Sequence, residues 1–427
     1  MPQPTKIQFL LNRLYQLNPP GRIELTLNRI QRLLKDLDNP ERKLSNVITV
    51  TGTNGKGSIC EYLKNILIEH NKTVNVYTSP HLVNFNERIF IHDHFINDDE
   101  FEKLVYKVDK ANNNQDITFF EFTTALAFLA FHNNPAEYHI IETGLGGIGD
   151  STNVFDAPIA QILSPISIDH LEYLGPTLKD IVINKCGIIK EKTKIIISRQ
   201  DSSVLKYIDD QLKHNNSQKF ILSENFQVHE ENGKMIYQDD MGLIDLSLPK
   251  MKGNFQIDNA ATAIQALRSF NFTLTNKYTS NAIAKTELPA RIQEIIKGKL
   301  RNYVHDENRL FIDGAHNKNG GKELANYLST MQGKQRIYFV FGMLTSKDLE
   351  GYLKNFSTII AEIKAVKLRE NFYETNEIIK IAKQLGIYAN PTKNIATGLS
   401  QLALQDPEGI IVIGGSLYLA GSALELN

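Results

Sequence analysis

One short segment constrains the fold of this chain more than any other. Residues 47–51 are the β-branched run Val-Ile-Thr-Val-Thr, and a glycine-rich turn and a helical pattern follow it directly. A strand, a glycine turn and a helix in this order let backbone N–H groups and the positive end of the helix converge on an anion, and Lys56 adds a full positive charge. The segment therefore predicts a phosphate site formed by Asn54, Gly55, Lys56, Gly57 and Ser58.

This turn departs from the Walker A pattern. Val50 stands where that pattern has its first glycine, and Gly57 follows the lysine where Ser or Thr is expected. The alternative is an ordinary glycine-rich turn between a strand and a helix. A lysine flanked by two glycines has little structural purpose in such a turn, so we favour the phosphate site.

The rest of the chain repeats an apolar run, a glycine turn and a helical period, which predicts an α/β fold with mostly parallel strands. A different pattern over residues 219–248, short alternating runs broken by Glu-Asn-Gly and Asp-Asp, predicts antiparallel strands. The strand-helix alternation restarts beyond residue 290. We therefore predict a large domain over residues 1–290 and a smaller one over 291–427.

Composition excludes several classes of protein. The 427 residues carry 47 Lys and Arg against 48 Asp and Glu, so a net charge of −1 offers no field to attract nucleic acid or anionic lipid. The longest apolar run, near residues 125–131, is too short to cross a bilayer. Residues 1–17 lack the apolar core of a secretory signal, so we expect a cytoplasmic protein. With only Cys60 and Cys186, a disulfide framework or a cysteine zinc site is not expected.

A series of short motifs in this chain resembles the folylpolyglutamate synthase and dihydrofolate synthase branch of the Mur ligase superfamily. The matching segments follow one another in the family's order from about residue 21 to 420. They are residues 51–58, 77–82, 142–147, 167–170 with 174–175, 185–188, 259–263, 313–317 and 415–418.

The resemblance implies a large P-loop-type ATPase domain and a smaller Rossmann-like domain. It also implies an ATP-dependent ligase that phosphorylates a carboxylate of a pterin substrate, after which the amine of L-glutamate attacks the acyl phosphate. Two Mg²⁺ ions are implied, one held by Ser79 and Glu142 and one by His170 and Lys185. The family's matching lysine is carbamylated, so we expect the same of Lys185. Lys56, Glu142, His170 and Lys185 are thus the expected catalytic residues.

Each of these assignments has a simpler alternative. Glu142 could be a capping or solvated carboxylate, although the end of a parallel strand is where such sheets place ligand sites. His170 could be an ordinary buried histidine, and Lys185 an unmodified lysine in a salt bridge. His81, in the same Ser-Pro-His element as Ser79, is expected to be structural.

The remaining site residues also follow from the resemblance. The nucleotide is expected to contact Asn259, Arg291 and Asp313, and the incoming glutamate His316 and Ser416. The pterin pocket is expected to include an aromatic segment formed by Thr118, Phe119, Phe120 and Glu121, for which packing on a helix face is the alternative. A second segment, Gly149, Asp150 and Ser151, and residues 21–24 are also expected to line the substrate.

Some positions depart from the family pattern. Ile148 stands where an arginine is usual, Ala290 replaces a glycine before Arg291, and Asn184 replaces a glutamate before Lys185. None of these positions is an expected metal ligand, but Ile148 leaves the preferred pterin open.

Two other classes of function remain as alternatives. A ligase for nucleotide-linked cell-wall precursors would need a further domain ahead of the phosphate turn, and about 50 residues are too few for one. An ATP-binding regulator without catalysis is the second. We expect a monomer whose partners are ATP, L-glutamate and dihydropteroate or a reduced folate, with the balance between the two acceptors open.

Overall fold

The computed structural model describes residues 6–16, 24–331, 333, 335–369 and 371–427. They form two compact units. The larger contains residues 24–166, 171–248 and 257–286 together with the described N-terminal residues, and the smaller contains 167–170, 249–256 and the described residues from 287 to 427. Residues 167–170, a short segment between elements of the larger unit, thus belong to the smaller one.

The larger unit is built on an eight-stranded sheet, in which β2, β5, β1, β6, β7 and β8 are parallel and β3 and β4 add an antiparallel edge. Its central strands β2, β1 and β6 are buried along their whole length, as expected when helices cover both faces. In spatial order the strands are β4 (His94–Phe95), β3 (Ile89–Ile91), β2 (Val74–Tyr77), β5 (Tyr138–Glu142), β1 (Val47–Thr51), β6 (Ala160–Leu163), β7 (Lys194–Ile197) and β8 (Gln218–Ile221).

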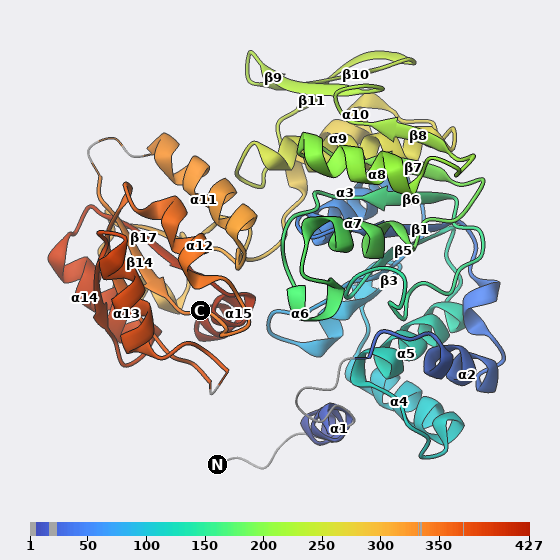
Figure 1. Ribbon diagram of the computed structural model, residues 1–427, viewed down its shortest axis with the longest axis horizontal. Coiled ribbons are helices and arrows are strands. Elements are labelled where there is room, and N and C mark those ends of the chain that lie inside the picture. Colours follow the sequence, from blue (N-terminus) through green and yellow to red (C-terminus); the bar gives the residue numbers. More distant parts are fainter. Residues whose placement is uncertain (1–5, 17–23, 332, 334, 370) are drawn as a thin grey trace. The chain divides into compact units, whose positions relative to one another are not determined.

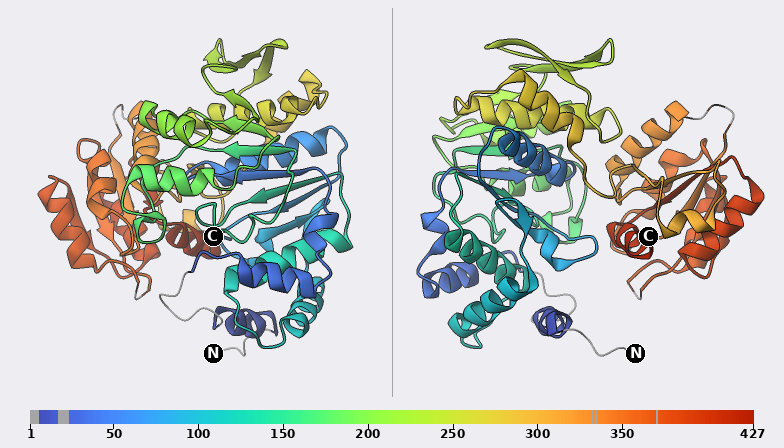
Figure 2. Two further views of the ribbon diagram at one scale, coloured as in Figure 1. Left: turned by 45° about the vertical axis from the view of Figure 1, so that its right-hand side comes forward. Right: turned by 180° about the vertical axis from the view of Figure 1, so that it is seen from behind.

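Helices cover both faces of this sheet. Figure 1 shows α7 and α8 in front of the sheet and α3, α9 and α10 behind it, and the reverse view in Figure 2 agrees. The α2, α4 and α5 helices form a second apolar core with Tyr77 and Ile141. The helices are α1 (Lys6–Tyr15), α2 (Asn28–Asp36), α3 (Lys56–Glu69), α4 (Asp98–Asn112), α5 (Phe119–Asn133), α6 (Leu171–Leu174), α7 (Leu178–Cys186), α8 (Ser202–Gln211), α9 (Phe255–Ser269) and α10 (Asn276–Lys285), with 3-10 turns η1 (Pro40–Lys43) and η2 (Phe85–Arg88).

A three-stranded antiparallel sheet follows β8 and packs beside α10. It consists of β9 (Gln227–Glu231), β10 (Lys234–Asp239) and β11 (Gly242–Ser247). The antiparallel strands predicted over residues 219–248 are therefore present, but the prediction started too early. Residues 218–221 form β8, which pairs in parallel with β7 because its apolar side chains continue the main sheet.

The smaller unit has a six-stranded sheet that is parallel except for β12. The strand order is β12 (Gln293–Glu294), β13 (Arg309–Ile312), β17 (Ile410–Gly414), β14 (Ile337–Phe341), β15 (Ile360–Ala365) and β16 (Tyr388–Pro391). One apolar core joins α11 (Lys318–Met331), α12 (Leu349–Leu353) and α13 (Thr375–Gln384) to this sheet. The other elements are α14 (Ile395–Gln405), α15 (Leu417–Leu426), η3 (Lys299–Tyr303) and η4 (Lys354–Phe356), of which α14 and α15 pack on β14 and β17.

The α/β class and the mostly parallel sheets predicted from the sequence are confirmed. The exact division at residue 290 stays a prediction. No helix within the described residues is both long enough and apolar enough to span a bilayer.

Candidate active site

The glycine turn after β1 has a backbone that side chains would obstruct. Gly52 has a φ of 145°, and a Cβ there would lie 2.0 Å from Ser164 Oγ. Gly55 has a φ of 82°, caps α3, and would place a Cβ 2.7 Å from Asn259 Oδ1. The N–H groups of Thr53 and Asn54 donate to Pro165 O at 2.9 and 3.1 Å, which fixes the turn. The predicted residues 54–58 thus form the end of a fixed turn and the first residues of α3, the geometry that binds phosphate.

Two lysines converge on this turn. Lys56 Nζ donates to the carbonyls of Gly52 and Thr53 at 3.3 and 3.2 Å, and Lys185 Nζ, from α7, donates to Gly52 O at 2.7 Å. Lys185 is buried, with 5% of its surface exposed. The two amino groups make the turn suited to a polyanion. We call residues 52–58 with Lys185 the phosphate cradle.

Glu142 and Ser79 both lie at the carboxyl ends of neighbouring parallel strands of the sheet. Glu142 ends β5 and is the parallel neighbour of Val50 in β1, and Ser79 follows β2 on the other side of β5. Ser79 N donates to Glu142 Oε2 at 3.1 Å, and Glu142 is 4% exposed. The predicted first magnesium ligands are therefore adjacent.

A carboxylate and a hydroxyl beside a phosphate cradle are oxygen donors that suit Mg²⁺, which typically takes one or two carboxylates and completes its shell with water and substrate phosphate. The described residues contain no group of three or more His, Cys, Asp or Glu side chains arranged for a metal. Lys185 Nζ donates a hydrogen bond to Gly52 O, and its role as a carbamylated metal ligand stays a prediction.

Two further predicted nucleotide contacts of the larger unit lie at the cradle. Asn259, on α9, is buried and touches Gly55. Ser58 is buried in the first turn of α3. The structure thus brings together the predicted residues Asn54, Gly55, Lys56, Gly57, Ser58, Ser79, Glu142, Lys185 and Asn259.

In the smaller unit, charged groups gather around Asp169. Its carboxylate binds Lys347 Nζ at 2.5 Å and Asn317 Nδ2 at 3.1 Å, and His316 Nε2 lies 3.6 Å away. Burial raises the pKa of Asp169, but its interaction with His316 and the charges of His170, His316 and Lys347 outweigh burial and hold that pKa well below its usual range. We call Asp169, His170, His316, Asn317 and Lys347 the Asp169 cluster, and its carboxylate favours the ionised form.

His170 is part of this cluster. Its φ of 53° is uncommon for a residue other than glycine, and its N–H donates to Asp169 Oδ1 at 2.9 Å. Its Nε2 lies 3.2 Å from Lys347 Nζ. The structure groups His170 with the smaller unit, so the predicted sharing of one metal by His170 and Lys185 stays a prediction.

Asp313 organises the predicted nucleotide contacts of the smaller unit. It is buried, and its carboxylate accepts from Ala315 N and Ile292 N, both at 2.8 Å. Burial raises the pKa of Asp313, against these two hydrogen bonds. Arg291 lies between Ala290 and Ile292, which have φ values of 57° and 46°. The glycine usual at position 290 would adopt this backbone without strain.

Ser416, the other predicted glutamate contact, is buried and caps α15, where its Oγ accepts from Tyr418 N at 3.1 Å. His316 Nδ1 lies 2.9 Å from Gly314 O. Contacts of these two residues with glutamate stay predictions.

The aromatic segment predicted to bind a pterin begins α5. Thr118 caps the helix, and Glu121 accepts from Thr118 N at 2.8 Å and from Arg29 Nε at 2.9 Å. Phe119 stacks on Tyr15 with ring centroids 4.7 Å apart, and Phe120 stacks on Tyr77 at 6.1 Å. Both phenylalanines are half-buried, so they pack on the protein and still expose ring surface.

The second predicted pterin segment is a tight turn. Asp150 is buried and accepts from Leu145 N at 2.7 Å and Thr152 N at 2.9 Å, and burial raises its pKa. Ser151 Oγ bonds Thr124 Oγ1 of α5 at 2.9 Å, and a Cβ on Gly149 would meet Leu25 O at 2.3 Å. The two segments are therefore neighbours. Residues 21–23 lie outside the described part of the chain.

Two groups of residues were missed by the sequence analysis. Lys347 and Asn317 complete the Asp169 cluster, yet neither stands in a pattern that predicts burial. Arg88 is 7% exposed and donates from Nε to His81 Nδ1 at 2.8 Å. Burial, and then the charge of Arg88, lower the pKa of His81 to about 4. The one sequence signal for a buried Arg88 is its position directly before a short apolar strand, β3.

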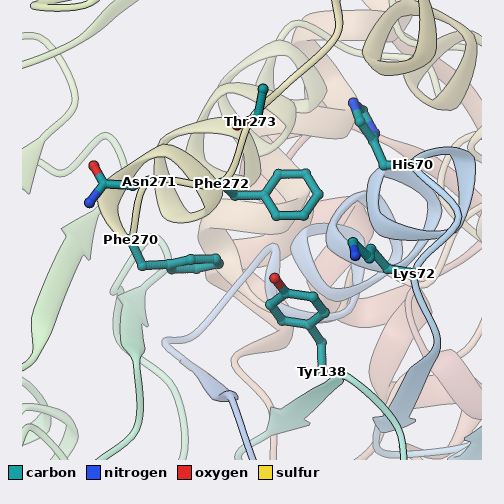
Figure 3. Close-up of a pocket in the computed structure, with 7 residues that line it drawn as sticks. All are labelled: His70, Lys72, Tyr138, Phe270, Asn271, Phe272 and Thr273. Carbon is teal, nitrogen blue, oxygen red and sulfur yellow. The ribbon is translucent and has the colours of Figure 1, made fainter.

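A separate pocket of about 310 Å³ lies at the opposite edge of the sheet, where β5 begins. Figure 3 shows Tyr138, Phe270 and Phe272 facing one another, with His70 and Lys72 beside them. Both ring nitrogens of His70 are hydrogen-bonded: Nδ1 donates to Ile66 O at 2.7 Å, and Nε2 accepts from Thr275 N at 2.9 Å. No predicted site residue lines this pocket.

Comparisons with known proteins agree with this geometry. Residues 50–267 match the Mur ligase middle domain family, and residues 296–426 match the family described as dihydrofolate synthetase, C-terminal domain. The probable dihydrofolate synthetase of Schizosaccharomyces pombe is 29% identical over 93% of this chain and 97% of its own length. The folylpolyglutamate synthase of Lacticaseibacillus casei is 30% identical over 92% of both chains.

Solved structures are similar over the whole chain. E. coli FolC in complex with DHPP and ADP has a TM-score of 0.86 at 26% identity and covers 97% of both chains. A Yersinia pestis bifunctional folylpolyglutamate synthase/dihydrofolate synthase, complexed with AMPPNP and Mn ion, has a TM-score of 0.85 at 25% identity and 97% coverage of both.

Proposed function

Because the chain belongs to the dihydrofolate synthase/folylpolyglutamate synthase family of Mur-type ligases, we propose that it uses ATP to join L-glutamate to a carboxylate of a pterin-containing acceptor. The acceptor is dihydropteroate, folylpoly-γ-glutamate or both, and ADP and phosphate are released. The observation that carries this function is the phosphate cradle with the Glu142–Ser79 pair at one sheet edge. A nucleotide and the cation that accompanies it need both.

The reaction has two steps. An oxygen of the acceptor carboxylate attacks the γ-phosphorus of ATP, the bond to the β-phosphate oxygen breaks, and an acyl phosphate and ADP form. The neutral amine of L-glutamate then attacks the carbonyl carbon, loses a proton, and expels phosphate as the amide forms. The first step brings anions together, so neutralising charge is the main task of the site.

Residues of the cradle perform that task. The N–H groups at the start of α3 and the amino group of Lys56 bind the phosphates, and Asn259 closes the turn beside Gly55. Glu142 and Ser79 would hold a Mg²⁺, and bound Mg²⁺ would supply Lewis-acid polarisation of phosphoryl oxygens. Similar solved structures that contain ADP, or AMPPNP and Mn, support this assignment.

We also propose that Lys185 is carbamylated in the active protein and then serves the second cation with His170. Its buried position, with Nζ 2.7 Å from Gly52 O in the phosphate turn, supports a role at the cradle. Native mass spectrometry of the intact protein in bicarbonate buffer should find an increase of about 44 Da, because CO₂ adds to the neutral lysine amine, and Lys185→Arg should abolish this increase. Fully active protein without the increase would contradict the proposal.

The smaller unit would bind the amino acid and part of the nucleotide. His316 and Ser416 are the proposed contacts of glutamate, and Arg291 with Asp313 those of ATP. The Asp169 cluster supports this proposal because it holds His316 and Lys347 in place. The monomeric state and the cytoplasmic location stay predictions.

One assay tests this function. Purified protein with Mg²⁺, ATP and L-glutamate should release phosphate only when dihydropteroate or tetrahydrofolate is added. Comparing the two acceptors side by side determines which activity dominates. The match of residues 296–426 to the dihydrofolate synthetase C-terminal domain favours dihydropteroate. If neither acceptor led to phosphate release, this result would support the alternative of a regulator that binds ATP without catalysis.

A further inference from the structure

Arg88 is a buried cation that has no carboxylate partner among the described residues. It ends η2, has 7% of its surface exposed, and within the described part of the chain its one side-chain hydrogen bond is from Nε to His81 Nδ1. The neighbouring carboxylate of Glu87 does not compensate it, since that group accepts from the N–H groups of Leu82, Val83 and Asn84. Charged side chains are rarely this buried unless they are paired.

The pair of Arg88 and His81 offers only hydrogen-bond donors. A guanidinium has five N–H donors and no acceptor, and Nε uses one of them. Because His81 Nδ1 accepts from Arg88, the proton of the neutral imidazole is on Nε2. The four Nη protons and the Nε2 proton have no acceptor among the described residues. A cluster of this kind is complementary to an anion with more than one acceptor oxygen.

Aromatic rings flank the guanidinium. Its carbon lies 5.6 Å from the ring centroids of both Phe85 and Phe119. Phe119 is half-buried and stacks on Tyr15, which is 44% exposed, so the aromatic surface continues outward from Arg88. An anion attached to a flat ring would use both the charge and this surface.

The position of the pair relates it to the candidate magnesium site. Thr78 N donates to Arg88 O at 3.0 Å, and Thr78 directly precedes Ser79, whose N–H binds Glu142. His81 follows Ser79 by two residues. Arg88 therefore lies at the sheet edge where β2 and β5 end, beside the aromatic segment that starts α5. The phosphates already have their own cradle at residues 52–58, so we assign a different anion to Arg88.

We propose that Arg88, oriented by its hydrogen bond to His81, recognises the aryl carboxylate of the acceptor. This inference rests on the proposed function, because dihydropteroate is an acceptor whose reacting carboxylate is attached directly to a benzene ring. Arg88 is then a substrate-binding residue for the acceptor, and His81 positions it.

The test compares two ligands that differ in charge. Binding of pteroate and of pteroate methyl ester is measured by equilibrium dialysis with AMPPNP and Mg²⁺ present, for the wild-type protein and for Arg88→Gln, Arg88→Lys and Arg199→Gln. Arg199, a half-exposed arginine paired with Asp258, is the matched control. Wild type and Arg199→Gln should prefer pteroate over the ester. Arg88→Gln should bind pteroate about tenfold or more weakly and the ester nearly unchanged, since a charge-assisted hydrogen bond is lost.

Arg88→Lys should retain part of the preference, because a point charge remains while the fork geometry is lost. Equal loss of both ligands in Arg88→Gln and Arg88→Lys would overturn the inference and show a structural role, and so would an unchanged preference in Arg88→Gln. If Arg88→Gln fails to fold, as thermal unfolding would show, the comparison of the two ligands in Arg88→Lys decides.

Kinetics separate this inference from the proposed function. Arg88→Gln should raise KM for dihydropteroate and leave KM for ATP and L-glutamate near wild type. An Arg88-dependent preference for pteroate in a protein that never ligates glutamate would support the binding role and contradict the function. Normal ligation with an unchanged KM for dihydropteroate in Arg88→Gln would do the reverse.

Discussion

The phosphate cradle of the larger unit and the Asp169 cluster of the smaller unit are built in different ways. Apart from Lys185, the cradle consists of consecutive residues whose backbone shapes the site, with Gly52 and Gly55 in conformations that disfavour side chains. The Asp169 cluster consists of side chains brought together from far apart, with Asp169 separated from Asn317 by 148 residues and from Lys347 by 178. A local backbone site is visible in a sequence, whereas a cluster of distant side chains needs the fold.

The largest effect on activity should come from Glu142, the proposed magnesium ligand beside the cradle. Glu142→Gln removes the proposed ligand charge but keeps the side-chain size, and we expect kcat/KM to fall ~10³-fold, as when a group that stabilises transition-state charge is lost. Steady-state phosphate release over a range of Mg²⁺ concentrations measures this.

Glu137→Gln is the matched control, because Glu137 lies just before the same strand and pairs with Lys72 at its exposed other end. Its activity should equal that of wild type. An equal loss of kcat/KM in Glu142→Gln and Glu137→Gln would mean that Glu142 has no special role in the reaction.

The Asp169 cluster should show its effect first in stability. Asp169→Asn leaves Lys347 buried without its charge partner, and removing one member of a buried pair costs about 3–5 kcal/mol of unfolding free energy. Urea unfolding followed by circular dichroism measures the change. The exposed Asp306→Asn is the control and should change stability by less than about 0.5 kcal/mol. A shift below about 1 kcal/mol in Asp169→Asn would show that the cluster does not depend on this carboxylate.

A smaller effect is expected at a local feature of the larger unit. Thr118→Ala removes the side chain that accepts from Glu121 N at the start of α5, and loss of such a cap costs about 1 kcal/mol. Thr118→Ser keeps the cap and should stay near wild type. If both variants unfolded at the same urea concentration, the cap would not contribute.

The smallest effect concerns backbone strain next to Arg291. Ala290 has a φ of 57°, a conformation that costs a residue with a Cβ about 1 kcal/mol or more, so Ala290→Gly should raise the unfolding free energy by about 0.5 kcal/mol. Ala263→Gly, in the buried interior of α9, should lower it instead. Destabilisation by Ala290→Gly would show that the backbone at residue 290 is not strained.

Much of the larger unit could be predicted because its signals are local. The β-branched strand, the glycine turn and Lys56 predicted the cradle, and period and turn patterns predicted the α/β class. The start of the antiparallel region was wrong because residues 218–221, Gln-Lys-Phe-Ile, pair in parallel with β7. Apolar strands carry no signal for the direction of their partner.

Other parts of the site could not be predicted. Nothing in the sequence shows that Lys347 is buried against Asp169 or that Arg88 lacks a carboxylate partner, since both facts depend on which segments the fold brings together. The motif around Asp313 predicted a nucleotide contact. The structure adds that this carboxylate accepts from the N–H of Ile292, which follows Arg291, and from the N–H of Ala315, which precedes His316.

The central claim is that the cradle activates a carboxylate for capture by the amine of glutamate. The most direct measurement uses ATP, Mg²⁺, L-glutamate and dihydropteroate made with ¹⁸O in its carboxylate. Dihydrofolate should form in amounts equal to the ADP released, and one ¹⁸O atom should appear in the phosphate, because the acyl phosphate passes that oxygen to the leaving group. Product without ¹⁸O in phosphate, or ADP release without any amide product, would contradict the account.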